Sequence, residues 1–281
     1  MGILSSLGIG RRTATEPLAY TDRLVVKLVV LVNLLFLYIP LLVLMAFSFN
    51  DSKRSIVWRG FTFKYFEKAL ENDQLMEALT NSLLVALTAT FFATILGTML
   101  GLVLQRFRFP GKGPVDAWAH LPIMIPEVCM GVSLLAFFAL VEIPLGLFTI
   151  IASHIAFCIP FVAIVVRARA ATIDPALEEA SFDLGASRMT TFWRITFPEL
   201  TPGIIAGALL AFTVSLDDFV ITFFTGGPGS TTFPIQVYSM IKFSVTPEIN
   251  AASTFLIVLT FIVIAAGLTL HARTSEKGPR L

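Results

Sequence analysis

The sequence predicts an all-α membrane protein, a polytopic bundle of six transmembrane helices. Hydrophobic residues make up 56% of the 281 residues and charged residues only 14%, whereas soluble domains are about half apolar and about a quarter charged. Six apolar blocks are each long enough to cross about 30 Å of hydrocarbon at a helical rise of about 1.5 Å per residue. A net charge of +1 gives no indication of nucleic-acid binding.

The predicted spans follow one another along a single domain. The first block is longer than the core of a cleaved signal peptide and lacks a small-residue cleavage site, so it is expected to stay in the protein. The chain then divides into a cytoplasmic N-terminal segment (1–23), a transmembrane domain (24–270) and a cytoplasmic tail (271–281). Pro122 and Pro126 are expected to kink the third span. The expected spans are 24–49, 82–104, 118–141, 148–166, 203–224 and 251–270.

Lysine and arginine residues indicate which loops face the cytoplasm, because cytoplasmic loops carry more of them. If the six spans alternate in direction, 14 of the 20 basic residues fall on the side that carries both termini. The loop after the first span is expected on the external side although it contains five basic residues. It also contains five acidic residues, which balance them. Both termini and the loop at 174–198 are therefore predicted to lie in the cytoplasm.

The loop at 174–198 has the signals of a folded helical element. Asp174 and Pro175 form a helix start, with a capping oxygen followed by a residue whose fixed φ suits the first turn. Two glutamates follow in that turn, where the helix dipole favours carboxylates. Gly185 is expected to turn the chain, and a second short apolar helix is expected before Pro198. These features alone fit either a capped connector or a docking surface for another protein.

The same loop resembles the cytoplasmic signature loop of the membrane subunits of ABC importers. That signature reads E-A-A, three residues, G, nine residues, I, one residue, L-P. The sequence keeps every spacing, although a serine replaces the second alanine and a phenylalanine replaces the leucine. The resemblance implies that the loop docks into a cleft of a separate ATPase subunit and receives its closing motion. The residues implied in this coupling are Glu178, Glu179, Ala180, Ser181, Gly185 and Pro198.

No ATP-binding site is expected in this chain. Gly111-Lys112 lacks the upstream glycine and the following serine or threonine of a phosphate-binding loop. The resemblance places ATP and Mg²⁺ in the partner ATPase, so the chain is expected to be a transport subunit without a cofactor, not an enzyme. His120, His154 and His271 do not form a metal-ligand set and are expected to be isolated packing residues.

Three carboxylates fall inside the predicted spans, Glu127 in the third and Asp217 and Asp218 in the fifth. A charge near the middle of a span costs about 3 kcal/mol, so such residues usually face the bundle interior or a water-filled path. No basic residue is expected inside a span to neutralise them, and a path with unpaired carboxylates favours a cation. Neighbouring residues point about 100° apart on a helix, so at most one aspartate faces the path. The alternative is structural: the aspartates cap a broken helix, and Glu127 is protonated and bonded to a neighbouring helix.

Further segments resemble the permeases of spermidine/putrescine-type ABC importers, and the likeness extends over 24–270. The resemblance implies an inner-membrane permease subunit, surrounded by lipid, that carries polyamines. It also implies an ATPase dimer, a second related permease and a periplasmic solute-binding protein as partners. The alternative is a proton-coupled secondary transporter that uses the three carboxylates, although the sequence shows no inverted repeat. The segments are Ser215-Leu-Asp-Asp-Phe-Val220, Gly227-Pro-Gly229, Thr231-Thr-Phe-Pro234 and Pro247-Glu-Ile-Asn-Ala251.

Overall fold

The computed structural model describes residues 24–52, 57–243 and 247–276. Within these residues the chain is helical apart from loops and one isolated bridge between Asn50 and Phe61, which confirms the predicted all-α class. The predicted segment 1–23 and residues 277–281 of the predicted tail lie outside the described residues. The elements are α1 (Leu24–Phe47), α2 (Lys64–Glu71), α3 (Asp73–Arg106), α4 (Lys112–Met124), α5 (Glu127–Leu140), α6 (Leu147–Ala170), α7 (Ala176–Asp183), α8 (Arg188–Thr191), the π-helix η1 (Phe192–Thr196), α9 (Phe197–Asp217), α10 (Val220–Thr225), α11 (Phe233–Phe243) and α12 (Pro247–Glu276).

In the described part of the chain, five helical segments are long and apolar enough to cross a membrane, and the bent pair α4 and α5 makes a sixth if counted as one span. These segments fall at the positions of the six predicted blocks. α3 extends well beyond its block and is about 50 Å long at about 1.5 Å per residue. Its start is capped by Asn72, whose side chain accepts a hydrogen bond from the backbone N–H of Leu75 at 3.1 Å. α3 therefore reaches past the hydrocarbon region and contacts the loops.

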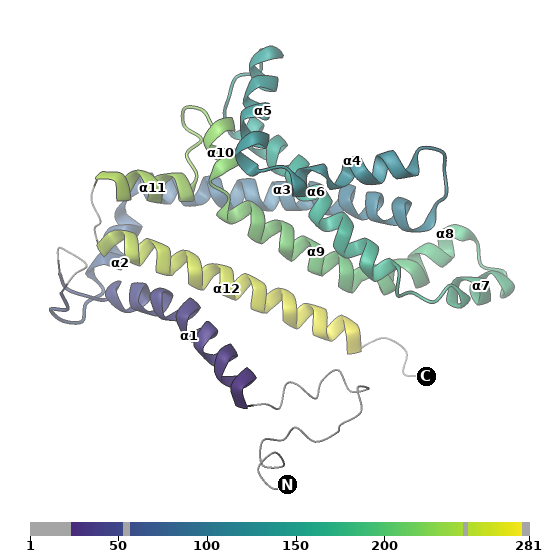
Figure 1. Ribbon diagram of the computed structural model, residues 1–281, viewed down its shortest axis with the longest axis horizontal. Coiled ribbons are helices and arrows are strands. Elements are labelled where there is room, and N and C mark those ends of the chain that lie inside the picture. The colour runs from purple at the N-terminus through teal and green to yellow at the C-terminus, as the bar shows by residue number, and fades with distance from the viewer. Residues whose placement is uncertain (1–23, 53–56, 244–246, 277–281) are drawn as a thin grey trace, which may run out of the picture.

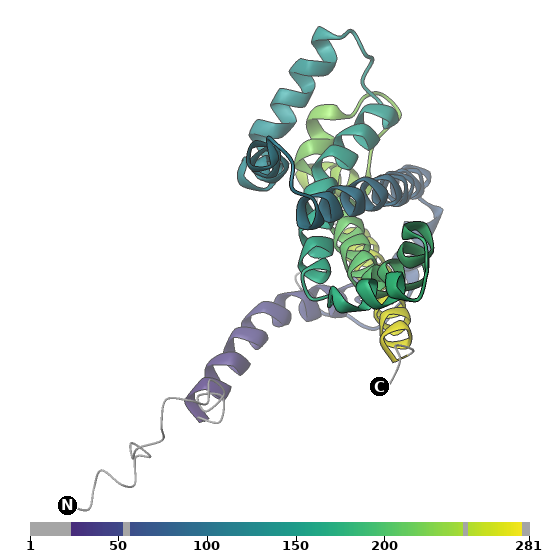
Figure 2. The same cartoon turned by 90° about the vertical axis from the view of Figure 1, so that its right-hand side faces the viewer.

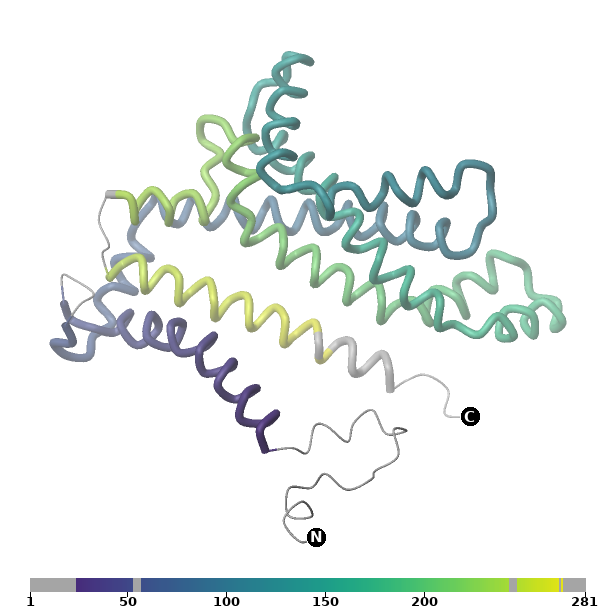
Figure 3. Tube along the Cα trace, viewed as in Figure 1, coloured from purple at the N-terminus to yellow at the C-terminus, as the bar shows by residue number. Residues whose placement is uncertain are grey.

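The centre of the bundle is formed by α3, α6 and α9, which pack side by side (Figures 1 and 3). α12 lies along α9, α2 and α11 lie at one end of the bundle and α7 and α8 at the other, and α5 and α10 project from its side (Figure 1). Burial of apolar side chains between these helices shields any polar group among them from water. The central apolar cluster includes Ala93 of α3, Val162 and Val166 of α6, and Leu200 and Ala211 of α9.

Small residues allow α3 to approach α6 closely. An added Cβ at Gly97 would lie 2.7 Å from the Cβ of Val162, and one at Gly101 would lie 2.7 Å from the carbonyl oxygen of Ala163. Glycines of α9 face α6 in a similar way. Close backbone approach through small residues is a common way for membrane helices to associate. The position of α6 between α3 and α9 therefore depends on these glycines.

The substitution Gly101→Val is expected to lower the melting temperature of the purified protein. The branched side chain would press on the backbone carbonyl of Ala163, and overpacking of this kind costs about 1–3 kcal/mol. Thermal unfolding in detergent measures the effect. Gly113→Ala is the matched control, because an added Cβ there meets no atom within 4 Å. An unchanged melting temperature for Gly101→Val would show that α3 and α6 are not packed this closely.

The third and fifth predicted spans are each broken into two helices. α4 and α5 meet at an angle of 107°, because the intervening Ile125 and Pro126 are extended. α9 ends at Asp217, and Asp218 is extended (φ −63°, ψ 127°) before α10 begins. The kink expected in the third span is present as a sharp bend, and the fifth span is broken at Asp218, as the structural alternative for the aspartates allowed. α10 packs against α5, so the two breaks belong to one structural unit (Figure 1).

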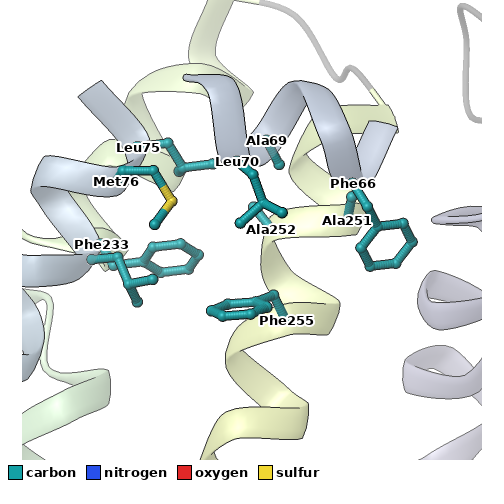
Figure 4. Close-up of a pocket in the computed structure, with 10 residues that line it drawn as sticks. Phe66, Ala69, Leu70, Leu75, Met76, Phe233, Ala251, Ala252 and Phe255 are labelled. Atoms are coloured by element: carbon teal, nitrogen blue, oxygen red, sulfur yellow. The ribbon is translucent and has the colours of Figure 1, made fainter. Parts of the chain in front are cut away.

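At the end of the bundle away from α7, the short helices α2 and α11 pack against α3 and α12 (Figure 1). Asn81 of α3 donates a hydrogen bond to the carbonyl oxygen of Thr231 at 3.0 Å, and the hydroxyl of Ser82 accepts one from the backbone N–H of Phe233 at 2.8 Å. Apolar side chains such as Phe233 enclose a small cavity of about 40 Å³ nearby (Figure 4). These contacts fix the loop between α10 and α11 and help to hold α10 in place.

α1 lies apart from the bundle and contacts it near the start of α12 (Figure 2). None of its residues is buried in the chain. A helix that is apolar on all sides must be covered by an apolar medium, either lipid or another membrane subunit. The apolar surface of α1 is therefore covered from outside this chain.

Candidate functional site

The break between α9 and α10 is built around Asp218. Its carboxylate accepts hydrogen bonds from the backbone N–H groups of Thr222 (2.9 Å) and Ile221 (3.3 Å), and from the Thr222 hydroxyl (2.9 Å). Amides at a helix start have no partner within the helix, so these bonds stabilise the start of α10. For Asp218, the structure thus shows the helix-capping arrangement considered above.

His154 of α6 joins the two sides of this break. Its Nδ1 lies 2.8 Å from the hydroxyl of Ser215 on α9, and its Nε2 lies 2.9 Å from the hydroxyl of Thr222 on α10. Nε2 also lies 3.3 Å from the carboxylate of Asp218, and the His154 and Asp218 side chains are only 1% and 2% exposed. His154 packs between helices, as expected, but it is not isolated, because it bonds across the break and lies beside the Asp218 carboxylate. The sequence carried one weak signal for this network, a histidine within an apolar block.

Asp217 and Glu127 lie at the two helix breaks and are exposed in the single chain. Asp217 is the last residue of α9, and Glu127 is the first residue of α5. Asp217 directly precedes Asp218, and α5, which begins at Glu127, packs against α10 just beyond the break. The dipole of α9 disfavours a negative charge at its C-terminal end. The site therefore concentrates negative charge that a bound cation would stabilise. The prediction that the two aspartates point in different directions is confirmed.

The predicted helix–turn–helix at 174–198 is present. The side chain of Asp174 accepts a hydrogen bond from the backbone N–H of Ala176 at 2.9 Å, and α7 begins there. α7 ends in a Schellman motif, in which the N–H of Ala186 bonds to the carbonyl of Ser181 and the N–H of Gly185 to that of Phe182. Gly185 takes φ +82°, a left-handed conformation that glycine adopts at low cost. The predicted turn at Gly185 is confirmed.

The second half of this loop differs from the prediction. α8 is capped by Ser187, whose hydroxyl accepts a hydrogen bond from the backbone N–H of Thr190 at 3.2 Å. It then continues through the π-helix η1 directly into α9. Pro198 does not end this segment, because it lies in the first turn of α9, where a proline needs no amide partner. The second half of the loop is therefore a direct extension of the membrane-spanning helix α9.

The residues predicted to contact an ATPase differ in how exposed their side chains are. Several apolar side chains that the coupling prediction did not include are also exposed, with Leu184 at 89%, Met189 at 67% and Trp193 at 56%. Of the predicted residues, Glu179, Ala180, Gly185 and Pro198 are exposed, Glu178 is partly buried and Ser181 is buried.

Glu178 points toward the bundle. Its Oε1 accepts hydrogen bonds from Arg106, the last residue of α3, and from the hydroxyl of Thr196 in η1. Partial burial alone would raise the pKa of Glu178, but these two hydrogen bonds and the charge of Arg106 hold its pKa below the usual range. Glu178 is therefore ionised at neutral pH and engaged within its own chain.

Comparison with known proteins identifies the family. Residues 90–277 match the family described as binding-protein-dependent transport system inner membrane component. The chain is 40% identical over 243 residues to the spermidine/putrescine transport system permease protein PotC of Escherichia coli (strain K12), which covers 86% of this chain and 92% of PotC. It is 39% identical over 256 residues to the putrescine transport system permease protein PotI of the same strain, covering 89% of this chain and 91% of PotI.

Solved structures share the fold at lower identity. A bacterial ABC transporter for the import of the acidic polysaccharide alginate matches with a TM-score of 0.68 and 20% identity, covering 87% of this chain and 92% of that chain. The inward-facing MetNI methionine ABC transporter matches with a TM-score of 0.61 and 21% identity, covering 71% of this chain and 95% of that chain. The fold and the family match agree. This chain belongs to the family of inner membrane components of binding-protein-dependent transport systems.

Proposed function

We propose that this chain is one permease subunit of an ATP-driven importer of polyamines. The observation that carries the proposal is the 40% identity to PotC across 92% of that protein, whose name gives spermidine and putrescine as the transported compounds. The exposed carboxylates of Asp217 and Glu127 support it, because polyamines carry several ammonium groups and charge-assisted hydrogen bonds to carboxylates are strong.

In this proposal Asp217 and Glu127 line the cation path, whereas Asp218 holds the junction of the two helix breaks in shape. The support for this division is that Asp217 and Glu127 are exposed in the single chain while Asp218 is buried and hydrogen-bonded. A second, related permease would cover the exposed pair and complete the pore. A periplasmic solute-binding protein would deliver the substrate to the outer mouth.

The loop at 174–198 is the proposed contact with an ATPase dimer that binds ATP and Mg²⁺. The exposed residues Glu179, Ala180 and Leu184 support this role. We place the loop and both termini in the cytoplasm. The support is that α12 runs toward the end of the bundle that carries α7, and that α1 runs away from that end (Figure 1). Closure of the ATPase dimer would move the loop, open the pore outward and drive alternating access by differential binding.

A proton-coupled secondary transporter is not favoured. The family is described as binding-protein-dependent, and the solved structures of the same fold are ABC transporters. A secondary transporter would also leave the exposed surface of the 174–198 loop without a partner. The three carboxylates are explained by a cationic substrate and by helix capping.

ATP turnover by the reconstituted complex tests the proposal. The chain is assembled in lipid with its partner permease, ATPase and binding protein, and is titrated with putrescine, spermidine, and neutral and anionic solutes. Polyamines are expected to stimulate turnover, and the other solutes are not. Turnover that responds to the binding protein but to no polyamine would contradict the substrate assignment alone. A chain that retains no ATPase on purification would contradict the role of the 174–198 loop.

A further inference from the structure

We propose that Glu178 is a positioning residue that transmits the motion of α7 to the membrane-spanning helices through Arg106 and Thr196, without contacting the ATPase. The inference rests on the proposed role of the 174–198 loop as the ATPase contact. It differs from the sequence-based prediction, in which Glu178 belonged to the contacting surface.

The connections of α7 to the rest of the chain are few. Its buried Ser181 hydroxyl lies 2.9 Å from the hydroxyl of Thr191, a contact that stays within the loop. Throughout the part of the chain that the structure describes, the Arg106–Glu178 pair is the only ion pair or hydrogen bond that joins α7 to α3. A displacement of α7 therefore acts directly on α3 through this pair.

The same carboxylate oxygen also accepts the hydrogen bond of Thr196, the last residue of η1. One oxygen of Glu178 thus links α7 to the end of α3 and to the start of α9. These two helices pack along one another in the centre of the bundle. A π-helix such as η1 interrupts regular α-helical bonding, and such segments are frequent at functional sites. The hydrogen bond to Thr196 holds η1 against α7. When the ATPase displaces α7, α3 and α9 therefore move together.

The partial exposure of the Arg106–Glu178 pair indicates that its main effect is on coupling and not on folding stability. The Arg106 and Glu178 side chains are 28% and 22% exposed. Ion pairs near the surface contribute little to folding stability, because water and salt screen them. Loss of the pair is therefore expected to change the coupling between ATP turnover and transport much more than the melting temperature.

The test compares transport per ATP hydrolysed in the reconstituted complex, with Glu178→Gln and Arg106→Gln as the variants. Each is expected to retain the ATPase at wild-type stoichiometry and to unfold only a little below the wild-type temperature. Each is expected to transport about tenfold less substrate per ATP, within the range known for residues that carry coupling. The charge-exchanged double variant Arg106→Glu with Glu178→Arg is expected to recover most of the loss.

Glu199→Gln is the matched control. It breaks a second ion pair at the same end of the bundle, between Arg169 of α6 and Glu199 of α9 at 2.8 Å, which does not involve α7. Its transport per ATP is expected to equal that of the wild type. Nitroxide labels at Asp183 and Phe107 give a separate readout in a Cys129→Ser background. Their distance is expected to stay constant between resting and vanadate-trapped wild-type complexes, and to change on trapping in Glu178→Gln.

Three results would overturn the inference. Loss of ATPase binding in Glu178→Gln would make Glu178 a direct contact. Unchanged transport per ATP in that variant, or an equal loss in Glu199→Gln, would remove the specific role of the pair. Failure of the wild-type complex to bind an ATPase is a different result, because it would overturn the proposed function itself.

Discussion

Replacing Asp217 with asparagine is expected to lower ATP-driven polyamine uptake by the reconstituted complex about 10- to 100-fold. The reason is the loss of a charge-assisted hydrogen bond to an ammonium group, worth about 1.5–3 kcal/mol. Asp217 and Glu127 are exposed carboxylates at the two helix breaks, which favours the binding of a cation. Initial uptake rates in proteoliposomes, with KM and kcat separated, measure the effect. Glu127→Gln is expected to act in the same direction.

Two variants make the result specific to the charge of Asp217. Asp217→Glu keeps the carboxylate and is expected to retain more uptake than Asp217→Asn. Glu71→Gln removes an exposed carboxylate at the end of α2, away from the helix breaks, and is expected to leave uptake unchanged. Wild-type uptake by Asp217→Asn would show that the cation path does not pass this residue.

Replacing His154 with leucine is expected to destabilise the protein by about 1–3 kcal/mol, the usual cost of leaving buried hydrogen-bonding groups without a partner. Leucine fills much of the space but leaves the Asp218 carboxylate, 2% exposed, without its imidazole neighbour. The link between Ser215 and Thr222 across the break is also lost. Thermal unfolding of the purified protein measures the change. Uptake is expected to fall as well, because α10 loses one of its two polar links to α6 among the described residues.

A double variant and a second histidine serve as controls for this prediction. Adding Asp218→Asn to His154→Leu removes the buried charge, so the double variant is expected to lose less stability than the sum of the two single changes. His120→Leu is the matched control, since His120 is 36% exposed and bonds to Asp116 within its own helical turn. Equal melting temperatures for His154→Leu and the wild type would show that the network does not stabilise the break.

The sequence was sufficient where the signals are local. Apolar blocks of span length predicted the membrane helices, because crossing hydrocarbon requires a continuous run of apolar residues whatever the neighbours are. The turn at Gly185 was also predictable, because a glycine after a short helical run supplies the left-handed residue that a Schellman motif needs. The spacing of the 174–198 loop predicted the family that the comparisons then identified.

The breaks within two spans were only partly visible in the sequence. Pro126 marked the third span for a kink, but a bend of 107° depends on where α5 finds its partner, α10. No proline near Asp218 indicated a break there. The sequence could name capping as one possibility for the aspartates, and only the packing of α6 against α9 and α10 decided that Asp218 takes that position.

The sequence by itself determined the class of the protein, the approximate spans and the folded loop, because these follow from composition and from interactions within one or two helical turns. The tertiary structure alone decided which polar groups meet. His154 lies 61 residues from Ser215, and Arg106 lies 72 residues from Glu178. No local preference encodes such pairs. They arise because close helix packing brings distant residues together in surroundings where an unpaired polar group is costly.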